Sequence, residues 1–391
     1  MRACWPTLLY FDHNATTPVA PEVADAVNAA LRDFWGNPSS IHGPGQLARQ
    51  KLEQSRRSVA EFLGALPAEF VFTSGGTESN NLAILGLVRN CSGARRHVVT
   101  TAIEHPAVLE PCRQLEREGV EVTQVSVGRN GIVDVDEIGR ALRDDTVLVS
   151  VMHANNEVGT IQPVAEIAEL VHRRRRAGQA IYLHSDGVQA LGKIDVDVRG
   201  LGIDLYSVSA HKMYAPKGTG GLFVARGTPL RAVQFGGRHE RERRAGTENV
   251  VGAAAFARGV EIPKERLFRD EFERLLTDNL SGVRVNASKV PRLPNTSSIT
   301  FDGISGEAMV IALDMKGMAV SSGSACSSGS TEPSHVLLAM GLTREEARSS
   351  VRFSFGRGNT QKDTEALAGA VIAAAAKLRK SATKEKNLVQ A

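Results

Sequence analysis

The apolar residues between positions 69 and 225 follow a pattern that predicts a β-sheet covered on both faces. Short runs rich in β-branched residues recur there, and helix-like segments separate most of them. Residues 147–152 are apolar at almost every position rather than at every second one, which is typical of a strand in a parallel sheet. We predict seven strands, at residues 69–73, 97–103, 120–127, 146–153, 180–185, 204–209 and 221–225.

The pattern changes after about residue 260. The elements predicted there are helices at residues 266–280 and 364–380 and strands at residues 297–301 and 351–355. We therefore expect an α/β protein with a large domain at residues 15–260, built on a mostly parallel seven-stranded sheet. A small α+β domain would comprise residues 1–14 and 261–391. Residues 381–391 are mostly polar and charged without clear periodicity, so we expect a frayed or extended tail.

Composition and charge exclude several classes of protein. The 391 residues include 47 Lys and Arg against 43 Asp and Glu, and a net charge of +4 does not suggest a dedicated nucleic-acid binder. Four arginines at residues 173–176 keep RNA binding open as an alternative, although such a cluster is typical of a solvated helix end. No segment approaches the roughly 20 apolar residues of a membrane span. The four cysteines are widely spaced, so neither disulfides nor a metal site is indicated, and we expect a cytoplasmic protein.

The first candidate for chemistry is the run Thr-Ser-Gly-Gly-Thr-Glu-Ser at residues 73–79, which follows a predicted strand and opens a helix. Small residues at a helix N-terminus let backbone N–H groups approach a phosphate, although plain helix capping explains the run equally well. Neither a P-loop nor a dinucleotide-binding motif occurs in the chain, so a phosphate bound here would belong to another kind of cofactor.

Asp186 and Lys212 stand at the ends of two later strands. Either one alone is more often a capping or surface charge. A buried lysine can form a Schiff base, and an aspartate that faces a pyridine nitrogen keeps the ring an electron sink. The order of phosphate loop, Asp and Lys on successive strand-helix units therefore favours pyridoxal 5'-phosphate as the cofactor.

Nine motifs make the chain resemble a known enzyme family. They stand at residues 12–18, 72–79, 104–108, 153–157, 184–189, 209–212, 245–249, 321–326 and 351–354. With them the chain resembles the class V aminotransferase-like pyridoxal-phosphate enzymes of fold type I, specifically the cysteine desulfurases of the NifS/IscS type. The resemblance extends from about residue 10 to residue 379, so it implies a fold type I transferase over nearly the whole chain.

The resemblance implies a role for each matching residue. Lys212 would form the Schiff base with the cofactor, Asp186 would pair with the pyridinium nitrogen, and Gln189 would bond the ring hydroxyl. His105 would stack on the ring. The cofactor phosphate would be bound by Gly76, Thr77, Ser209 and His211, and Thr247 would reach the phosphate in the neighbouring subunit of a homodimer. Arg352 and Asn155 would bind the substrate carboxylate, and Asn155 would also contact the cofactor.

Cys326 selects the reaction. It stands in a Ser- and Gly-rich segment with little to bury, so we expect an exposed thiol. The resemblance implies that its thiolate, with His105 as a candidate base, attacks the sulfur of L-cysteine and yields L-alanine and a persulfide on Cys326. A sulfur-acceptor protein, either an iron-sulfur scaffold or an enzyme that thiolates tRNA or a cofactor, would then take the sulfur.

Three rival interpretations stay open at this point. Selenocysteine lyase or aminotransferase activity would use the same cofactor, but transamination needs no thiol. A catalytically silent scaffold is disfavoured because Lys212 and Cys326 are both present.

The chain also departs from the IscS branch, with Gly187-Val188 in place of Ala-Thr, and we expect Gly187 to loosen the contact of Asp186 slightly. The C-terminal tail lacks the IscS-type ending, which puts docking to an iron-sulfur scaffold in doubt.

Overall fold

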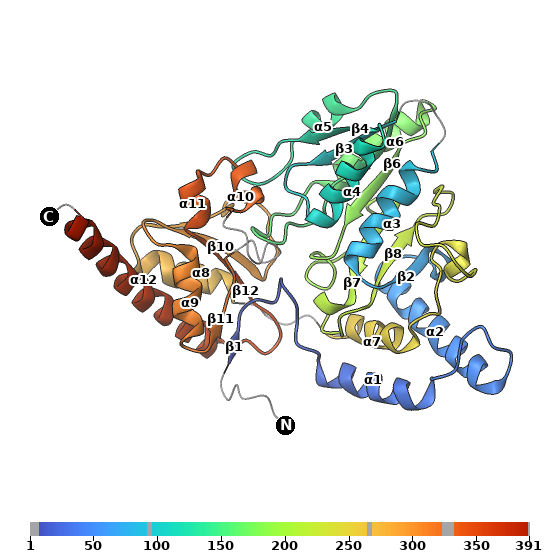
Figure 1. Cartoon of the computed structure of the whole chain (residues 1–391), viewed down its shortest axis with the longest axis horizontal. Helices are drawn as coiled ribbons and strands as arrows, with labels where there is room; N and C mark the ends of the chain where they lie inside the picture. The colour runs from blue at the N-terminus through green and yellow to red at the C-terminus, as the bar shows by residue number, and fades with distance from the viewer. Residues whose placement is uncertain (1–7, 92–95, 264–267, 323–331, 390–391) are drawn as a thin grey trace.

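The computed structural model describes residues 8–91, 96–263, 268–322 and 332–389, with side chains up to residue 380. Two units lie side by side, and the C-terminal helix runs along the far side of the smaller unit (Figure 1). Cys326 and Cys4 lie outside the described residues. No helix in the described part of the chain is long and apolar enough to cross a membrane.

The large unit contains a seven-stranded sheet, so the predicted fold class is confirmed. Its strands are β2 (Phe70–Thr73), β3 (His97–Thr101), β4 (Glu121–Val125), β5 (Thr146–Ser150), β6 (Tyr182–Asp186), β7 (Leu205–Ser209) and β8 (Gly220–Val224). They lie in the order β2-β8-β7-β6-β5-β3-β4. Only β8 runs antiparallel to its neighbours, and every predicted strand of this sheet corresponds to an observed one.

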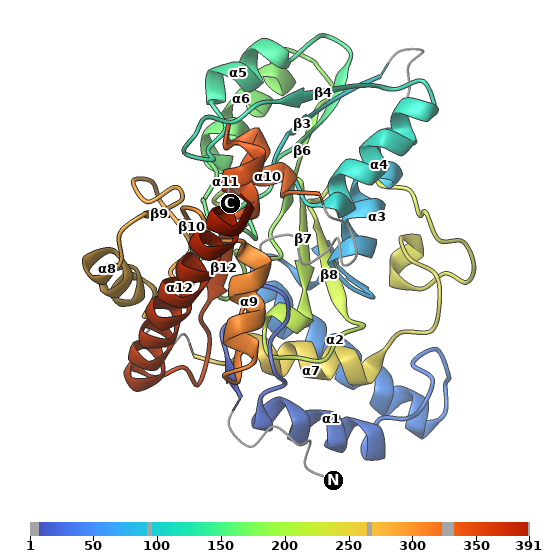
Figure 2. The ribbon, with the colours of Figure 1, turned by 60° about the vertical axis from the view of Figure 1, so that its left-hand side comes forward.

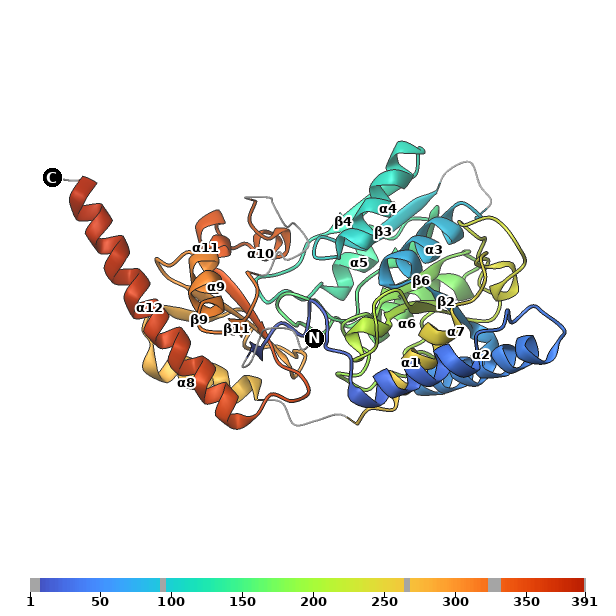
Figure 3. The ribbon, with the colours of Figure 1, turned by 60° about the horizontal axis from the view of Figure 1, so that its bottom comes forward.

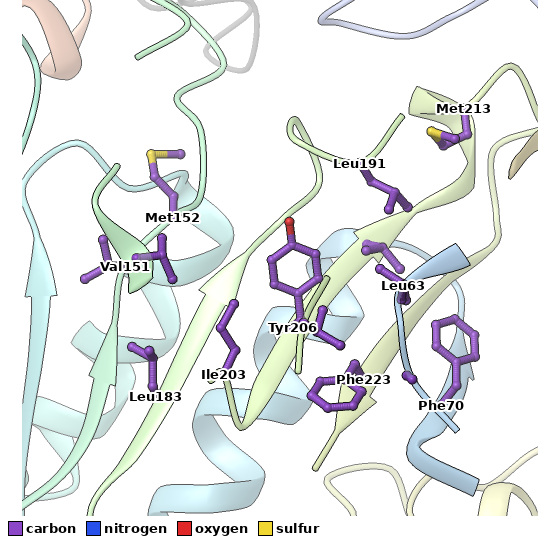
Figure 4. Close-up of a cluster of buried hydrophobic side chains, with 14 of the residues drawn as sticks. Leu63, Phe70, Val151, Met152, Leu183, Leu191, Ile203, Tyr206, Met213 and Phe223 are labelled. Atoms are coloured by element: carbon purple, nitrogen blue, oxygen red, sulfur yellow. The ribbon is translucent and has the colours of Figure 1, made fainter. Parts of the chain in front are cut away.

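Helices cover both faces of the sheet, because successive residues of each strand point to opposite sides. The helices of this unit are α1 (Pro21–Asp33), α2 (Gly43–Phe62), α3 (Gly76–Val88), α4 (Pro106–Arg117), α5 (Val135–Ala141), α6 (Val164–Arg176) and α7 (Val250–Val260), with short 3-10 turns η1 (Pro67–Glu69), η2 (Ala210–Lys212) and η3 (Glu240–Glu242). Phe70 and Phe72 pack toward α2 and α7, while Val71 between them packs toward α3 and α4. Figure 4 shows part of the apolar cluster that contains Phe70, with Tyr206 near its centre.

The smaller unit has its own apolar core. Its elements are α8 (Arg269–Asn279), β9 (Val283–Val285), β10 (Thr296–Phe301), α9 (Gly306–Asp314), β11 (Met318–Ala319), α10 (His335–Ala339), α11 (Arg344–Arg348), β12 (Ser350–Ser354) and α12 (Gln361–Val389), joined by the N-terminal strand β1 (Leu9–Tyr10). β12, β10 and β9 form an antiparallel sheet, and β1 pairs with β11. Helices α8 and α9 pack against α12, as Figure 2 shows for α9.

Two features bear on the predicted organisation. The prediction of a frayed tail is wrong for its backbone, because α12 continues to Val389. The predicted division into a large domain of residues 15–260 and a small domain of residues 1–14 and 261–391 stays a prediction. Figure 3 shows α1, α2 and α7 packed together on one side of the large unit, where the described N-terminal residues leave the smaller unit and enter the larger one.

Candidate active site

A cavity of about 550 Å³ lies between the two units, at the carboxyl ends of the parallel strands. This is where open α/β sheets bind their ligands, and the volume is in the range of small-molecule sites. The predicted site residues that line it are Gly76, Thr77, His105, Asp186, Gln189, Ser209, His211, Lys212 and Arg352. Residues more than 270 positions apart in the chain therefore meet here.

One end of the cavity is suited to an anion. Gly76 and Thr77 form the first turn of α3, where backbone N–H groups lack partners within the helix. The Ser209 side chain is almost fully buried, and its Oγ has no hydrogen-bond partner among the described residues. A Cβ at Gly76 would lie 2.7 Å from Val188 Cγ2, so a larger residue would crowd this end. Backbone donors and an unpaired hydroxyl are what a phosphate requires.

Asp186 is held at both carboxylate oxygens. Oδ2 accepts a hydrogen bond of 2.6 Å from Asn80 Nδ2, and Oδ1 accepts one of 2.9 Å from the Val188 N–H. We expected Gly187 to loosen the position of Asp186, but packing explains why a glycine stands there. A Cβ at this position would lie 1.9 Å from Tyr206 Cζ. The carboxylate is thus fixed. Sequence analysis missed Asn80, although its place one turn after Thr77 on α3 was a usable signal.

Lys212 follows β7 on the turn η2, and its amine donates to the backbone carbonyls of Asn14 and Ala15, the latter at 2.6 Å. Lys193, not predicted from the sequence, lies close by. Its amine donates to Asn14 Oδ1 at 2.8 Å and to Gln189 Oε1. Burial, with the Lys212 and Arg352 charges, holds the pKa of Lys193 well below its usual range.

Lys193 and Asn14 fix the Gln189 amide. Gln189 Nε2 donates to the Asn14 carbonyl at 3.0 Å, while Oε1 accepts from Lys193. Because the amide oxygen already has its donor, the amide group can offer only its second N–H hydrogen to a ligand in the cavity. That orientation suits a contact with a ring oxygen. Asn14 belongs to the motif at residues 12–18, but the sequence pattern did not indicate its role as the centre of this network.

The two predicted histidines of the cavity are held in different ways. His105 is the N-cap of α4, where Nδ1 accepts a hydrogen bond of 3.0 Å from the Ala107 N–H. Burial lowers the pKa of His105, the Asp186 charge opposes this, and Lys212 adds to the lowering. His211 Nδ1 is 3.0 Å from Thr16 Oγ1, and burial together with Lys212 lowers its pKa to about 4. Both rings are therefore neutral at pH 7.

Arg352 approaches the cavity from β12, where its side chain is 3% exposed. One terminal nitrogen donates to Asp12 Oδ1 at 2.7 Å and the other to the Asn156 carbonyl at 3.0 Å. Nε has no hydrogen-bond partner among the described residues. Each terminal nitrogen has a second hydrogen, so the guanidinium can still donate to an incoming carboxylate.

Two predicted residues, Asn155 and Thr247, do not line the cavity. Asn155 is fully buried; its Nδ2 donates to the Ile103 carbonyl, and its Oδ1 accepts from two backbone N–H groups. A contact between this amide and a ligand would require some of these bonds to break. Thr247 is exposed on the loop before α7. Cys326 lies outside the described residues, and its role stays a prediction.

The described residues on either side of the Cys326 segment lie at the cavity. Ser321 exchanges two backbone hydrogen bonds with Arg352, and residues 332–335 belong to the lining. Ser334 Oγ donates to Glu157 Oε2 at 2.5 Å, and His335 Nε2 lies 2.9 Å from the Glu104 carbonyl oxygen. These two contacts were missed by sequence analysis, because nothing in a local pattern indicates pairing between residues so far apart.

Comparison with known proteins places this geometry in a family. The family model described as aminotransferase class-V matches residues 9–367. The chain belongs to the class V aminotransferase family. A cysteine desulfurase IscS from Dictyoglomus turgidum is 44% identical over 364 residues, which cover 91% of either chain. Enzymes of this family depend on pyridoxal phosphate.

Solved structures that resemble this chain agree with the family assignment. A NifS-like protein superposes with a TM-score of 0.83 at 36% identity, covering 94% of this chain and 98% of its own. A structure described as SspA in complex with cysteine has a TM-score of 0.81 at 35% identity, covering 89% of this chain and 99% of its own. The predicted resemblance to NifS/IscS-type cysteine desulfurases and the fold type I architecture are confirmed.

Proposed function

We propose that the protein is a pyridoxal-phosphate-dependent cysteine desulfurase, which converts L-cysteine to L-alanine and carries the released sulfur as a persulfide on Cys326. One observation carries the proposal: Asp186 at the end of β6, Lys212 just after β7 and Arg352 in the middle of β12 converge on a single cavity. The similarity to cysteine desulfurases and to a structure described as a cysteine complex supports L-cysteine as the substrate.

The cavity fits the cofactor. The α3 N-terminus and the unpaired Ser209 hydroxyl would hold the phosphate, with His211 beside them. The fixed Asp186 carboxylate would pair with the ring nitrogen, and the Gln189 amide would donate to the ring hydroxyl. When bound, pyridoxal phosphate stores the electron pair that the substrate's Cα–H bond leaves behind.

Four residues would bind the substrate, take its α-proton and shield the cofactor from water. Arg352 would orient the substrate carboxylate with its remaining N–H groups, and Asn155 would assist once the hydrogen bonds of its amide rearrange. Lys212 would take the α-proton of the substrate as general base. The neutral His105 ring would stack against the cofactor and exclude water from that face.

Cys326 is proposed as the sulfur nucleophile. It is four residues beyond Ser322, the last described residue before it, and six before Glu332, which lines the cavity. An extended chain spans about 3.3 to 3.6 Å per residue, so a separation of four residues corresponds to at most roughly 14 Å of chain. The sequence separation therefore allows the thiol to enter the cavity. An acceptor protein for iron-sulfur assembly or for thiolation of tRNA or a cofactor would receive the sulfur outside it.

The enzyme is also proposed to act as a homodimer, with Thr247 reaching the phosphate in the neighbouring subunit. Large apolar side chains on the surface of the large unit support association: Trp35, Ile41 and Phe235 are 71%, 92% and 79% exposed. Sedimentation of the purified protein, with and without Thr247→Ala, tests the assembly separately from the cofactor affinity.

The decisive experiment combines a spectrum with a product assay. The purified protein should show the visible absorption of a bound pyridoxal cofactor, and L-cysteine should be converted to alanine and sulfide. Cys326→Ala should keep the absorption and lose alanine formation. A colourless protein that cannot be reconstituted would overturn the cofactor proposal, whereas full alanine formation by Cys326→Ala would overturn the persulfide route.

A further inference from the structure

Lys193 reaches the Gln189 amide from outside the cavity proposed for the cofactor. Gln189 lines that cavity, whereas Lys193 lines a second cavity of about 250 Å³. Lys212 lines both, so the two cavities are neighbours. Among the described residues that line the larger cavity, Lys193 does not occur. Its amine is therefore placed to act on a bound ligand through Gln189 rather than by touching the ligand.

A tight turn brings the Lys193 side chain back to Gln189. The Lys193 N–H donates to the Ala190 carbonyl at 3.0 Å. Gly192, between them, has a φ of +75°, in the left-handed region that favours glycine. A Cβ at Gly192 would also lie 2.2 Å from Met213 Sδ, so packing requires a glycine there as well. The backbone thus fixes the point from which the lysine side chain extends.

The Gln189 amide is held at both ends. Its Nε2 donates to the Asn14 carbonyl at 3.0 Å, and its Oε1 accepts from the Lys193 amine. A backbone carbonyl only accepts and an amine donates, so both contacts agree on which end of the amide is the oxygen. Lys193 uses two hydrogens, one for Gln189 and one for Asn14, and a lysine amine has two in either protonation state. The amide orientation is therefore independent of the charge of Lys193.

Asn14 gives the Lys193 amine a fixed attachment. Asn14 Oδ1 accepts from Lys193 at 2.8 Å and from Asn295 Nδ2 at 3.0 Å. Asn14 Nδ2 donates to Thr296 Oγ1 at 2.8 Å and to the Asn156 carbonyl at 3.0 Å. Both hydrogens and both lone pairs of this buried amide are used. A buried polar network that is satisfied in this way holds one arrangement, so the position of the Lys193 amine is well defined.

We propose that Lys193 is a positioning residue that holds the Gln189 amide with its remaining N–H toward the ring oxygen of pyridoxal phosphate. The inference rests on the proposed function, because it concerns the cofactor named there. Without the Lys193 amine, Gln189 Oε1 loses the donor that turns it away from the ligand. An N–H held in this direction favours a cofactor with a hydrogen-bond acceptor at this ring position. Lys193 thereby contributes to the choice of cofactor without contacting it.

The test compares two ligands of the full-length protein after removal of its cofactor: pyridoxal 5'-phosphate and an analogue that lacks only the ring hydroxyl. Lys193→Met removes the amine and keeps the side chain at nearly the same length. Its affinity for pyridoxal 5'-phosphate should fall by about 10- to 100-fold, the range of one hydrogen bond to a charged group. Its affinity for the analogue should change by less than about twofold, because that ring has no oxygen to accept the bond. Spectroscopic titration measures both affinities.

Further variants separate positioning from a merely structural role. Lys289→Met is the matched control, because Lys289 is an exposed lysine of the smaller unit, and both affinities should stay unchanged. In a Gln189→Leu background, Lys193→Met should cause no further loss of affinity for pyridoxal 5'-phosphate, because Lys193 acts through the Gln189 amide. Melting temperature identifies variants that have folded. If Lys193→Met does not fold, Lys193→Gln gives the same comparison, since its amide is one bond shorter and cannot bridge Asn14 and Gln189.

The inference and the proposed function fail in different ways. If the wild type forms no coloured complex with pyridoxal 5'-phosphate, the proposed function is wrong. If the wild type forms the complex but folded Lys193→Met loses equal affinity for both ligands, or loses none, Lys193 does not direct Gln189 to the ring oxygen. A further loss of affinity when Lys193→Met is added to Gln189→Leu would also overturn the inference.

Discussion

The two walls of the cavity hold their side chains in different ways. On the sheet wall, formed by the ends of β2, β6 and β7, Asp186 is bonded to Asn80 and to its own turn, all within the large unit. On the second wall, formed by Arg352 and residues 332–335, the main hydrogen bonds run to distant segments, such as Arg352 to Asp12. The sheet wall is therefore set by secondary structure, whereas the second wall depends on a few individual bonds.

The largest effect should come from the sheet wall's reactive amine. Lys212→Ala removes the proposed anchor of the cofactor and the base for the α-proton, so alanine formation should fall by at least about 10²- to 10⁴-fold. The melting temperature should change little, because the Lys212 amine donates to the backbone carbonyls of Asn14 and Ala15, which line the same cavity and can bind water there instead. Coupled measurement of turnover and thermal unfolding checks both statements, and measurable wild-type turnover in Lys212→Ala would contradict the assignment.

On the second wall, Arg352→Lys should raise the KM for L-cysteine by about 10- to 100-fold. A charged hydrogen bond contributes about 1.5 to 3 kcal/mol and each tenfold change corresponds to 1.4 kcal/mol, and lysine lacks the two-donor fork. Steady-state kinetics measures the effect. Arg284→Lys is the matched control, because Arg284 is an exposed arginine of the same sheet that pairs with Glu346. An unchanged KM for Arg352→Lys would remove Arg352 from substrate binding.

The next effect concerns packing under the sheet wall. Gly187→Ala should destabilise the protein by about 1 to 3 kcal/mol, because the new Cβ would overlap the Tyr206 ring. Tyr206→Leu makes room, so the double variant should lose less stability than the sum of the two single variants. Urea unfolding of all four proteins measures the coupling. Strict additivity would show that Tyr206 is not the reason for glycine at this position.

Gly187 also illustrates what the sequence could and could not predict. The seven strands were predictable because buried parallel strands are continuous apolar runs, and Asp186 and Lys212 were predictable because they follow such runs directly. The need for glycine at position 187 was not predictable, because it comes from the Tyr206 ring on the neighbouring strand, which leaves no room for a Cβ. A local pattern does not report which side chain stands opposite.

The second wall was the least predictable part of the site. His335 is bonded to a backbone carbonyl 231 residues away, and any residue type could have supplied that carbonyl. The Lys193 amine was overlooked for a similar reason, because its partners Asn14 and Gln189 come together only in the folded chain. The motifs identified which residues form the site, whereas long-range hydrogen bonds orient their side chains.

The dependence of the second wall on single bonds predicts the effect of Ser334→Ala. The change removes the cap of α10 and leaves the buried Glu157 carboxyl without its hydroxyl donor, so stability should fall by about 1 to 3 kcal/mol. Ser305→Ala is the matched control, because Ser305 caps α9 without a buried carboxyl partner and should cost about 1 kcal/mol. Equal losses in denaturant unfolding would mean that the Glu157 contact adds nothing.

The smallest effect concerns acid and the sheet wall. His184 lies between Ser150 Oγ and Ser207 Oγ, at 2.8 and 3.0 Å, and burial lowers its pKa to about 3; burial lowers that of His153 to about 4. An unfolded histidine has a pKa of about 6.5. Both folded pKa values are depressed, so the unfolded chain binds protons first as the pH falls. The stability that these rings contribute is complete above about pH 6.5 and is lost progressively toward pH 4 and 3.

Each such ring should therefore steepen the loss of unfolding free energy by about 1.4 kcal/mol per pH unit. Urea unfolding at pH 5.5 and 4.5 should show a slope shallower by that amount in His184→Gln than in the wild type, because carboxylate contributions are common to both proteins and cancel. Identical slopes for the wild type and His184→Gln would mean that His184 is already protonated inside the sheet wall.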